Sequence, residues 1–185
     1  MSVASEFLAS VIKRFKEYKS LGEKTFAQLN AEELLHQPNE ASNSIAVIVQ
    51  HLHGNMLSRW TNFLTEDGEK SWRQREAEFE VRSFTKEQLL QLWEEGWGVF
   101  LESLESLRED DLLKTVTIRS QPLVVIDAIN RQLAHYSYHV GQIVYLGRWM
   151  KNSDWLSLSI PKGESAAYTA ELNSSGQEAG KSVRN

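Results

Sequence analysis

Four long segments in which apolar residues recur at helical spacing constrain the fold of this chain most strongly. Side chains three and four positions apart share one face of a helix, so each segment predicts an amphipathic helix with one buried face. Four such helices most simply pack around one core. The sequence therefore predicts an all-α fold, a four-helix bundle, with helices over about Ser5 to Leu29, Asn43-Ser44 to about Asp67-Gly68, Thr85 to Leu107 and about Val125 to Met150.

The connections between these helices differ in kind. Residues 66–84, between the second and third helices, form a charged stretch that is long enough for a lid or a crossover. Residues 114–119, between the third and fourth helices, alternate like a strand, and Ser120-Gln121-Pro122 can turn them into a short hairpin with residues 123–125. We therefore expect a long connection between helices two and three, and a short β-hairpin before the last long helix.

Length and composition predict one helical domain followed by a tail. A chain of 185 residues with six tryptophans can bury a sizeable core. After Trp155 the sequence becomes polar and contains serine, glycine and alanine. We expect residues 1–158 to form the bundle and residues 159–185 to form a polar C-terminal tail that is partly mobile.

Charge and residue usage narrow the functional class. The net charge of −5 and the scattered basic residues make a nucleic-acid partner a poor expectation. The absence of cysteine excludes disulfides, cysteine-ligated zinc and a cysteine nucleophile within the chain. No apolar run has the length of a signal peptide or a membrane span, so no membrane partner is expected. These features predict a cytoplasmic enzyme or binding protein.

His135 and His139 are the first candidate metal ligands. They lie four residues apart in the last long helix, which places both imidazoles on one face where they can bind one ion. With five histidines in the chain, such a pair arises by chance in about one chain in ten. A third ligand from another helix is therefore needed to make a convincing site.

The second predicted helix offers His51 and His53 as that third ligand. Residues two apart point about 200° away from each other on a helix, so the two cannot serve one ion comfortably. Periodicity slightly favours His53, which lies nearer the centre of the apolar stripe. His51 shares its side with Ile48 and Asn55, so it can also face inward. Spacing alone leaves both alternatives open.

The order of these motifs resembles a known family. Ser44-Ile45 through Gln50-His51-Leu52, followed by His135-x-x-x-His139-Val140-Gly141-Gln142-Ile143, is similar to the DinB/YfiT-like superfamily of metal-binding four-helix bundles. The resemblance covers roughly residues 5–150, including the predicted hairpin. It implies that His51, His135 and His139 are the metal ligands and that His53 is a neighbour.

Two further groups of motifs resemble one subgroup of that superfamily. They are Asp67-Gly68-Glu69-Lys70 with Trp72-Arg73-x-Arg75, and Ser159-Ile160-Pro161-Lys162-Gly163. These motifs assign no chemistry to the subgroup.

Other polar residues receive more modest roles. We expect His36 to lie in a loop and His53 to lie at the surface or to support a ligand. Tyr136 and Tyr138 are expected in packing or at a rim, and Gln142 is placed to support the site. Arg59 and Arg131 are candidate anion-binding residues by position, although a solvated face explains them equally well.

Three neutral imidazoles leave a bound ion its full charge and an open coordination position, as catalytic sites require. Zinc or nickel suits such ligands best, while iron and manganese remain open. The glutamate that follows the first histidine in metalloproteases is absent, because Tyr136 stands there, so a peptidase is disfavoured.

The resemblance implies a transferase that activates a low-molecular-weight thiol toward an electrophilic small-molecule substrate. Bacillithiol, mycothiol or glutathione would supply the sulfur. The alternatives are a metal-dependent hydrolase and a non-enzymatic metal-binding stress or interaction protein. The resemblance also implies a homodimer, for which the tryptophans can provide an interface, although six tryptophans can equally fill one core.

Overall fold

The computed structural model describes residues 2–182, and it confirms a mostly helical fold with one short antiparallel hairpin. Six α-helices and three short 3₁₀ segments account for most of these residues. In chain order the elements are α1 (Val3–Ala27), α2 (Ala31–Leu35), α3 (Ile45–Trp60), η1 (Glu76–Phe79), α4 (Lys86–Glu105), η2 (Glu109–Asp111), β1 (Thr115–Ile118), β2 (Gln121–Val124), α5 (Val125–Lys151), η3 (Asn152–Asp154) and α6 (Ser165–Ser182).

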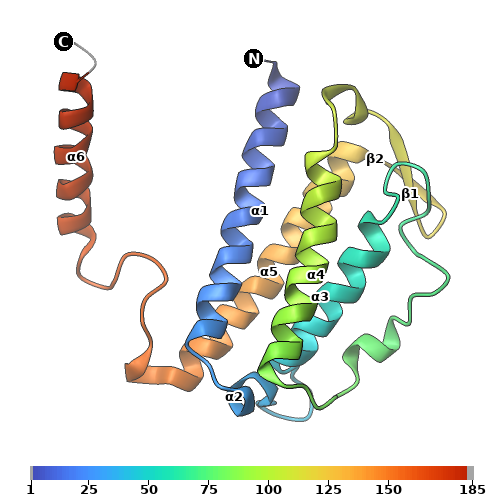
Figure 1. The fold of residues 1–185 in the computed structure, drawn as a ribbon, viewed down its shortest axis with the longest axis horizontal. Helices are drawn as coiled ribbons and strands as arrows, with labels where there is room; N and C mark the ends of the chain where they lie inside the picture. Colours follow the sequence, from blue (N-terminus) through green and yellow to red (C-terminus); the bar gives the residue numbers. More distant parts are fainter. Residues whose placement is uncertain (1, 183–185) are drawn as a thin grey trace.

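The long helices α1, α3, α4 and α5 form the bundle (Figure 1). Helix α3 packs on α4, and α1 packs on α5. Contacts of α1 with α4 and of α3 with α5 join the two pairs. Helices α3 and α5 run in opposite directions, so the end of α3 lies near the start of α5 (Figure 1). This arrangement brings the two helices that carry the predicted ligands side by side.

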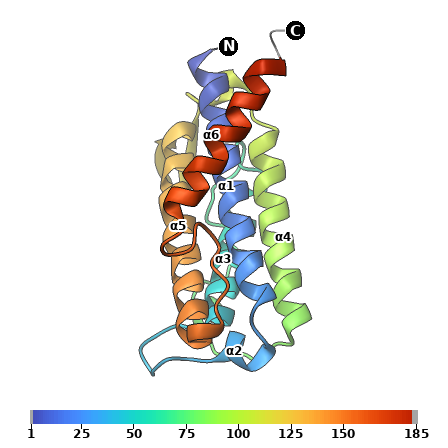
Figure 2. The ribbon, with the colours of Figure 1, turned by 90° about the vertical axis from the view of Figure 1, so that its left-hand side faces the viewer.

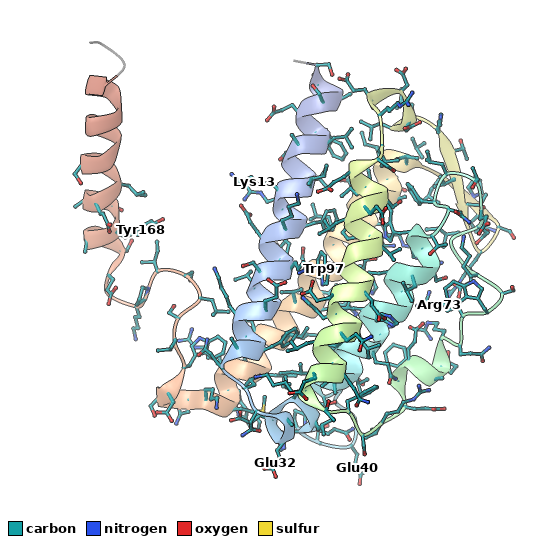
Figure 3. The ribbon with its side chains drawn as sticks, in the orientation of Figure 1. Lys13, Glu32, Glu40, Arg73, Trp97 and Tyr168 are labelled. Atoms are coloured by element: carbon teal, nitrogen blue, oxygen red, sulfur yellow. The ribbon has the colours of Figure 1, made fainter. Side chains whose placement is uncertain are left out.

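Aromatic side chains from all four helices meet in the core. The ring of Phe100 in α4 lies 4.5 Å from Phe15 in α1, 4.7 Å from Trp60 in α3 and 5.2 Å from Tyr136 in α5. Trp97 packs against the same cluster, and Figure 3 shows it within the bundle. Because large rings in such contacts resist sliding, this cluster fixes α5 relative to α3.

Gly96 explains how closely α3 and α4 approach. A Cβ atom at this position would lie 3.1 Å from the backbone Cα of His53 and 3.2 Å from Sδ of Met56. The glycine that weakens the middle of the predicted third helix therefore permits its tight packing on α3.

Helix α3 ends earlier than the sequence predicted. Its last residue is Trp60, whereas the apolar pattern placed the end near Asp67. The chain leaves the helix at Thr61, whose ψ is 122°, and Asn62 follows with a φ of 51°. Phe63 then packs back on Trp60, with ring centroids 4.4 Å apart. The apolar residue that seemed to extend the helix instead packs from the turn that follows it.

The hairpin lies where it was expected, but its turn does not. Arg119 and Ser120 occupy the turn, both with positive φ, as a two-residue turn of type I′ requires. The prediction that the turn comprises Ser120-Gln121-Pro122 was wrong, since Pro122 belongs to β2 opposite Thr117. Proline is tolerated because each strand of this two-stranded sheet has a free edge.

Two helices were not predicted. The five-residue α2 begins with a capping box between Asn30 and Glu33 and lies between the first two predicted helices. Within the predicted tail, residues 165–182 form α6, and its side chains from 165 to 174 are all exposed. Figures 1 and 2 show α6 standing outside the bundle. Among residues 2–182, no helix combines the length and the apolar character needed to cross a bilayer.

Candidate metal centre

The structure brings His51, His135 and His139 together. His51 lies on α3, and the other two lie one turn apart on the facing side of α5. One ring nitrogen of each histidine lies within 4.8 Å of those of the other two. His51 and His139 are buried, and His135 is partly buried. The three side chains that the resemblance assigned as ligands are therefore close enough to hold one ion.

Helices α3 and α5 each contribute a row of three polar side chains spaced four residues apart. On α3 the row is His51, Asn55 and Arg59, and on α5 it is Arg131, His135 and His139. Four-residue spacing keeps the members of a row on one helix face. Because α3 and α5 run in opposite directions, the histidines of the two rows gather at one end and the arginines at the other.

The second ring nitrogen of each histidine has a hydrogen-bond partner. Nδ1 of His51 lies 2.9 Å from Oε2 of Glu78, Nδ1 of His135 lies 3.2 Å from Oε1 of Gln132, and Nδ1 of His139 lies 2.9 Å from Oε1 of Gln142. An oxygen acceptor requires the proton on Nδ1, which leaves the lone pair of Nε2 available. All three imidazoles are therefore held in the tautomer that suits ligation through Nε2.

The separation between two of these nitrogens fits a bound metal. Nε2 of His51 lies 3.3 Å from Nε2 of His135. Two lone pairs at this distance repel each other unless a cation lies between them. Two nitrogens that bind zinc tetrahedrally at about 2.0 to 2.1 Å are themselves separated by about 3.3 Å. The donor set and this spacing therefore fit a divalent ion.

The carboxylate of Glu78 orients His51 from behind. Arg73 in turn holds that carboxylate with two bonds, from Nε to Oε1 at 2.7 Å and from Nη2 to Oε2 at 2.9 Å. Burial opposes ionisation of Glu78, but the hydrogen bonds from His51 and Arg73 outweigh it and hold its pKa below the usual range. The result is a carboxylate–histidine pair of the kind that supports metal ligands.

Gly54 makes room for this carboxylate. A Cβ at position 54 would lie 2.5 Å from Oε1 of Glu78 and 2.8 Å from its Cδ. The long connection between α3 and α4 brings Glu78 against α3 one turn beyond His51. On the same segment, Phe79 stacks on the His51 ring with centroids 4.7 Å apart. Figure 3 shows Arg73 on this side of the bundle.

Two of the three imidazoles are held neutral. Burial, followed by the neighbouring His139, His51 and two arginines, lowers the pKa of His135 to about 3. Burial, followed by His51, lowers the pKa of His139 to about 4 despite its bond to Gln142. At neutral pH both rings therefore carry a free lone pair on Nε2, so an ion need not displace a proton from that nitrogen.

The histidines open into a pocket of about 560 Å³ that is rich in arginine. None of its lining residues is Asp or Glu, although the chain as a whole is acidic. Tyr138 and Phe79 contribute the aromatic part of the wall. Five arginines line the pocket, namely Arg59, Arg73, Arg75, Arg119 and Arg131.

A comparison with family models gives the relationship of the chain to known proteins. The model described as "Protein of unknown function (DUF1572)" matches residues 2–164. The chain belongs to this family. The match covers both histidine helices and the connection that carries Glu78, and it ends immediately before α6. No curated protein matches this DUF1572 chain.

The remaining predicted residues of the DUF1572 protein take distinct places. His53 lies outside the histidine cluster and pairs with Glu95 of α4 at 3.3 Å, so the slight preference of the apolar stripe for this residue was misleading. A Cβ at Gly96 would lie 3.1 Å from the Cα of His53, so the backbone of His53 faces α4 although its ring does not reach the histidine cluster. His36 follows α2, where it stacks on Trp149.

The two tyrosines and Gln142 behave as expected. Tyr136 is fully buried, donates to Oδ1 of Asn55 and accepts from Nε1 of Trp60. Burial raises its pKa, so it packs as a neutral phenol. Tyr138 is about half exposed and lies at the rim of the pocket, while Gln142 supports His139.

Sequence reasoning did not identify Glu78 or Gln132 as parts of this centre. Glu78 is 27 residues from His51 and lies in a segment with no periodic pattern, so no local signal pointed to it. Gln132 precedes His135 by three residues on the same helix, which is the spacing that places Gln142 beside His139. That repeated three-residue offset is the signal that would have found it.

Proposed function

We propose that this protein is a DinB-like metalloprotein in which His51, His135 and His139 bind one divalent ion, with zinc or nickel preferred. Imidazole nitrogen suits both metals. The single observation that carries the proposal is the convergence of the three histidines, each with its Nδ1 already bonded to an oxygen. The bundle, the hairpin and the order of the motifs agree with the resemblance that assigned these ligands.

We further propose that the protein transfers a low-molecular-weight thiol to an electrophilic small molecule. Bound at the three imidazoles, a divalent ion would supply positive charge that favours the thiolate form of such a thiol. The protein contains no cysteine, so the sulfur has to come from a second molecule such as bacillithiol, mycothiol or glutathione. A pocket of about 560 Å³ beside the histidines has room for both reactants.

The residues around the pocket favour thiol transfer over hydrolysis. Hydrolysis by an activated water usually relies on a nearby carboxylate as a general base. None of the residues that line the pocket is Asp or Glu, and the nearby carboxylate of Glu78 is already bonded to Arg73 and His51. A thiol depends less on a general base, because its pKa lies much closer to neutral than that of water.

The proposed reaction balances without a redox partner. The sulfur forms a bond to the electrophilic carbon, and the leaving group departs with the electron pair of the broken bond. The proton of the thiol passes to solvent. The chain's own part is to hold the neutral imidazoles in place, to orient His51 through Glu78 and to shape the pocket.

Metal content tests the first half of the proposal. We expect protein purified without a histidine tag to contain close to one ion per chain, or to take it up on reconstitution. His51→Ala, His135→Ala and His139→Ala should each lose the ion while keeping a helical circular dichroism spectrum. His53→Ala and His36→Ala are matched controls and should keep it. Retention of the ion by all three cluster variants would refute the site.

Activity tests the second half. The metal-loaded protein is incubated with 1-chloro-2,4-dinitrobenzene and each of the three thiols, and we expect thiol-dependent formation of the conjugate that His135→Ala abolishes. Thiol-independent cleavage of p-nitrophenyl acetate would replace transfer by hydrolysis. Metal binding with neither activity would favour a non-enzymatic stress or interaction protein.

We also propose that the protein acts in the cytoplasm, where small thiols are kept reduced, and that it forms a homodimer. Tyr138, Tyr145 and Trp149 support the dimer, because they are exposed and lie seven and four residues apart along α5. Light scattering during size-exclusion chromatography should give twice the chain mass for the parent. Trp149→Lys should give the chain mass, whereas a parent that elutes as a monomer would contradict the dimer.

A further inference from the structure

The arginine end of the pocket has no role in metal binding or in the proposed thiol chemistry. Arg59 lies two turns along α3 from His51, and Arg131 lies one turn before His135 on α5. The hairpin turn contributes Arg119 to the same pocket. Guanidinium groups from α3, α5 and the hairpin turn therefore line one cavity, in a chain whose net charge is −5.

Carboxylates only partly compensate these guanidinium groups. A single carboxylate, Glu69, is shared by Arg59 at 3.0 Å, Arg119 at 3.1 Å and Arg73 at 3.5 Å. Arg73 is also paired with Glu78. The remaining carboxylate, Glu76, lies at the surface and pairs with Arg75. With five guanidinium groups and three carboxylates, the wall carries an excess of two positive charges before any ion binds.

Arg59 and Arg131 have hydrogen-bond donors that no described part of the chain uses. Arg131 makes no ion pair or hydrogen bond with any part of the chain that the structure describes. Arg59 is buried and uses Nη1 for both of its contacts, donating to the carbonyl of Gly68 and lying beside Glu69. Its Nε and Nη2 make no hydrogen bond with the side chains and backbone that the structure describes. These two nitrogens are not buried without a partner, and Arg59 lines the pocket, so its free donors are open to a ligand there.

We infer that the pocket binds a small molecule bearing a phosphate or carboxylate group, with Arg59, Arg119 and Arg131 holding the anionic group and the histidines facing the rest of the molecule. Guanidinium groups present paired donors that match the oxygens of such anions. The inference deepens the proposed function, on which its description as a substrate site rests, by giving the chemical class of one reactant. Anion binding itself requires no turnover, so it can be tested separately.

Isothermal titration calorimetry at low ionic strength tests the inference with inorganic phosphate and with succinate as probes. Each probe is titrated into chelator-treated protein and into zinc-loaded protein. The variants are Arg131→Gln and the double variant Arg119→Gln/Arg131→Gln, whose side chains are exposed enough to spare the fold. Arg148→Gln is the matched control, because Arg148 is an exposed arginine of α5 outside the pocket.

We expect at least one probe to bind the metal-free parent, and each pocket arginine removed to weaken binding about tenfold. Arg148→Gln should bind like the parent. The same pattern in a protein that shows no thiol transfer would uphold the anion site while the proposed function fails. The inference is overturned if neither probe binds the parent protein, with or without zinc. It is also overturned if binding requires zinc and is unchanged in the double variant, because the anion is then bound by the zinc ion and not by the arginines.

Discussion

Glu78 is the residue on which the geometry of the histidine cluster most depends outside the histidines themselves. It accepts from His51 and from two nitrogens of Arg73, so it links the histidine-bearing face of α3 to the arginine cluster. Hydrogen bonding to the far nitrogen of a ligating imidazole fixes both its tautomer and its orientation. The contribution of this carboxylate can be measured without removing a ligand.

Glu78→Gln should weaken zinc binding about 10- to 100-fold while leaving the fold intact. The amide keeps the shape of the side chain but removes the charge that favours the proton on Nδ1 of His51. Competition with a chromophoric chelator measures the dissociation constant, and the exposed neighbour Glu80 provides the control Glu80→Gln. An unchanged affinity in Glu78→Gln would show that the carboxylate does not orient the ligand.

Gly54→Ala and Gly98→Ala form a matched pair of helix substitutions. The new Cβ at position 54 would collide with the carboxylate of Glu78, so we expect zinc affinity to fall about tenfold. Position 98 has no atom within 4 Å of the added Cβ, so Gly98→Ala should raise the free energy of unfolding by about 0.5 to 1 kcal/mol. Urea unfolding and chelator competition measure the two effects. Equal zinc affinities in the two variants would contradict the role given to Gly54.

The three clustered histidines were accessible to sequence reasoning, whereas their hydrogen-bond partners were not. The four-residue spacing of His135 and His139 on a long helix identified them as candidates, and the resemblance selected His51 over His53. The bond from Glu78 depends on how the 25-residue connection between α3 and α4 folds back on α3, which no periodic pattern records. Local spacing can find contacts within a helix, but it cannot find contacts made by an irregular segment.

At the scale of elements, the four long helices were predictable because each carries its own apolar stripe. The capping box of Thr85 and Gln88 fixed the start of α4 to the residue. The end of α3 was missed because Phe63 continues the apolar pattern after the chain has left the helix at Thr61. Helix α2 is a single turn or little more, too short for periodicity to reveal.

Asp67 ties the end of the α3 segment to the hairpin, and this connection has a predictable pH dependence. Its carboxylate accepts from the backbone amides of Glu69, Arg119 and Ser120. These bonds lower its pKa from 3.8 to about 2, against the effect of burial. A lowered folded-state pKa means that the stabilisation is complete above about pH 4 and is lost as the pH falls toward 2.

Asp67→Asn should therefore lower the free energy of unfolding at pH 7 by about 1 kcal/mol, a figure that allows for solvent screening of a partly exposed carboxylate. The deficit relative to the parent should shrink as the pH is lowered from 4 toward 3. Urea unfolding at several pH values measures it, and the exposed Asp154→Asn is the control. A deficit that does not change with pH would show that charge contributes nothing to this connection.

At the scale of the whole molecule, α6 stands outside the bundle (Figure 1). The described side chains of α6 are exposed, and the family match stops at residue 164. After α5, the backbone of Leu156 is joined to the Gln28 side chain of the bundle by two hydrogen bonds, of 2.8 and 3.1 Å. The predicted boundary after residue 158 lies just beyond these bonds.

Chains that end after residue 164 or after residue 158 should therefore keep the zinc site and unfold within about 2 °C of the full chain. The reason is that neither truncation removes core residues or the Leu156 bonds. Thermal denaturation followed by circular dichroism, with metal content measured in parallel, checks both. A large loss of stability in the shorter chain alone would move the domain boundary to within residues 159–164.

The irregular segment that carries Glu78 also bears on how fast an ion can come and go. His51, His135 and His139 lie on long helices that pack through a buried aromatic core, whereas the carboxylate behind His51 is held by a connection with one short 3₁₀ turn. Irregular segments open locally far more often than whole bundles unfold. Ion exchange at this site should therefore follow the brief opening of residues 61–85, with the three ligands still in place, instead of waiting for the bundle to come apart.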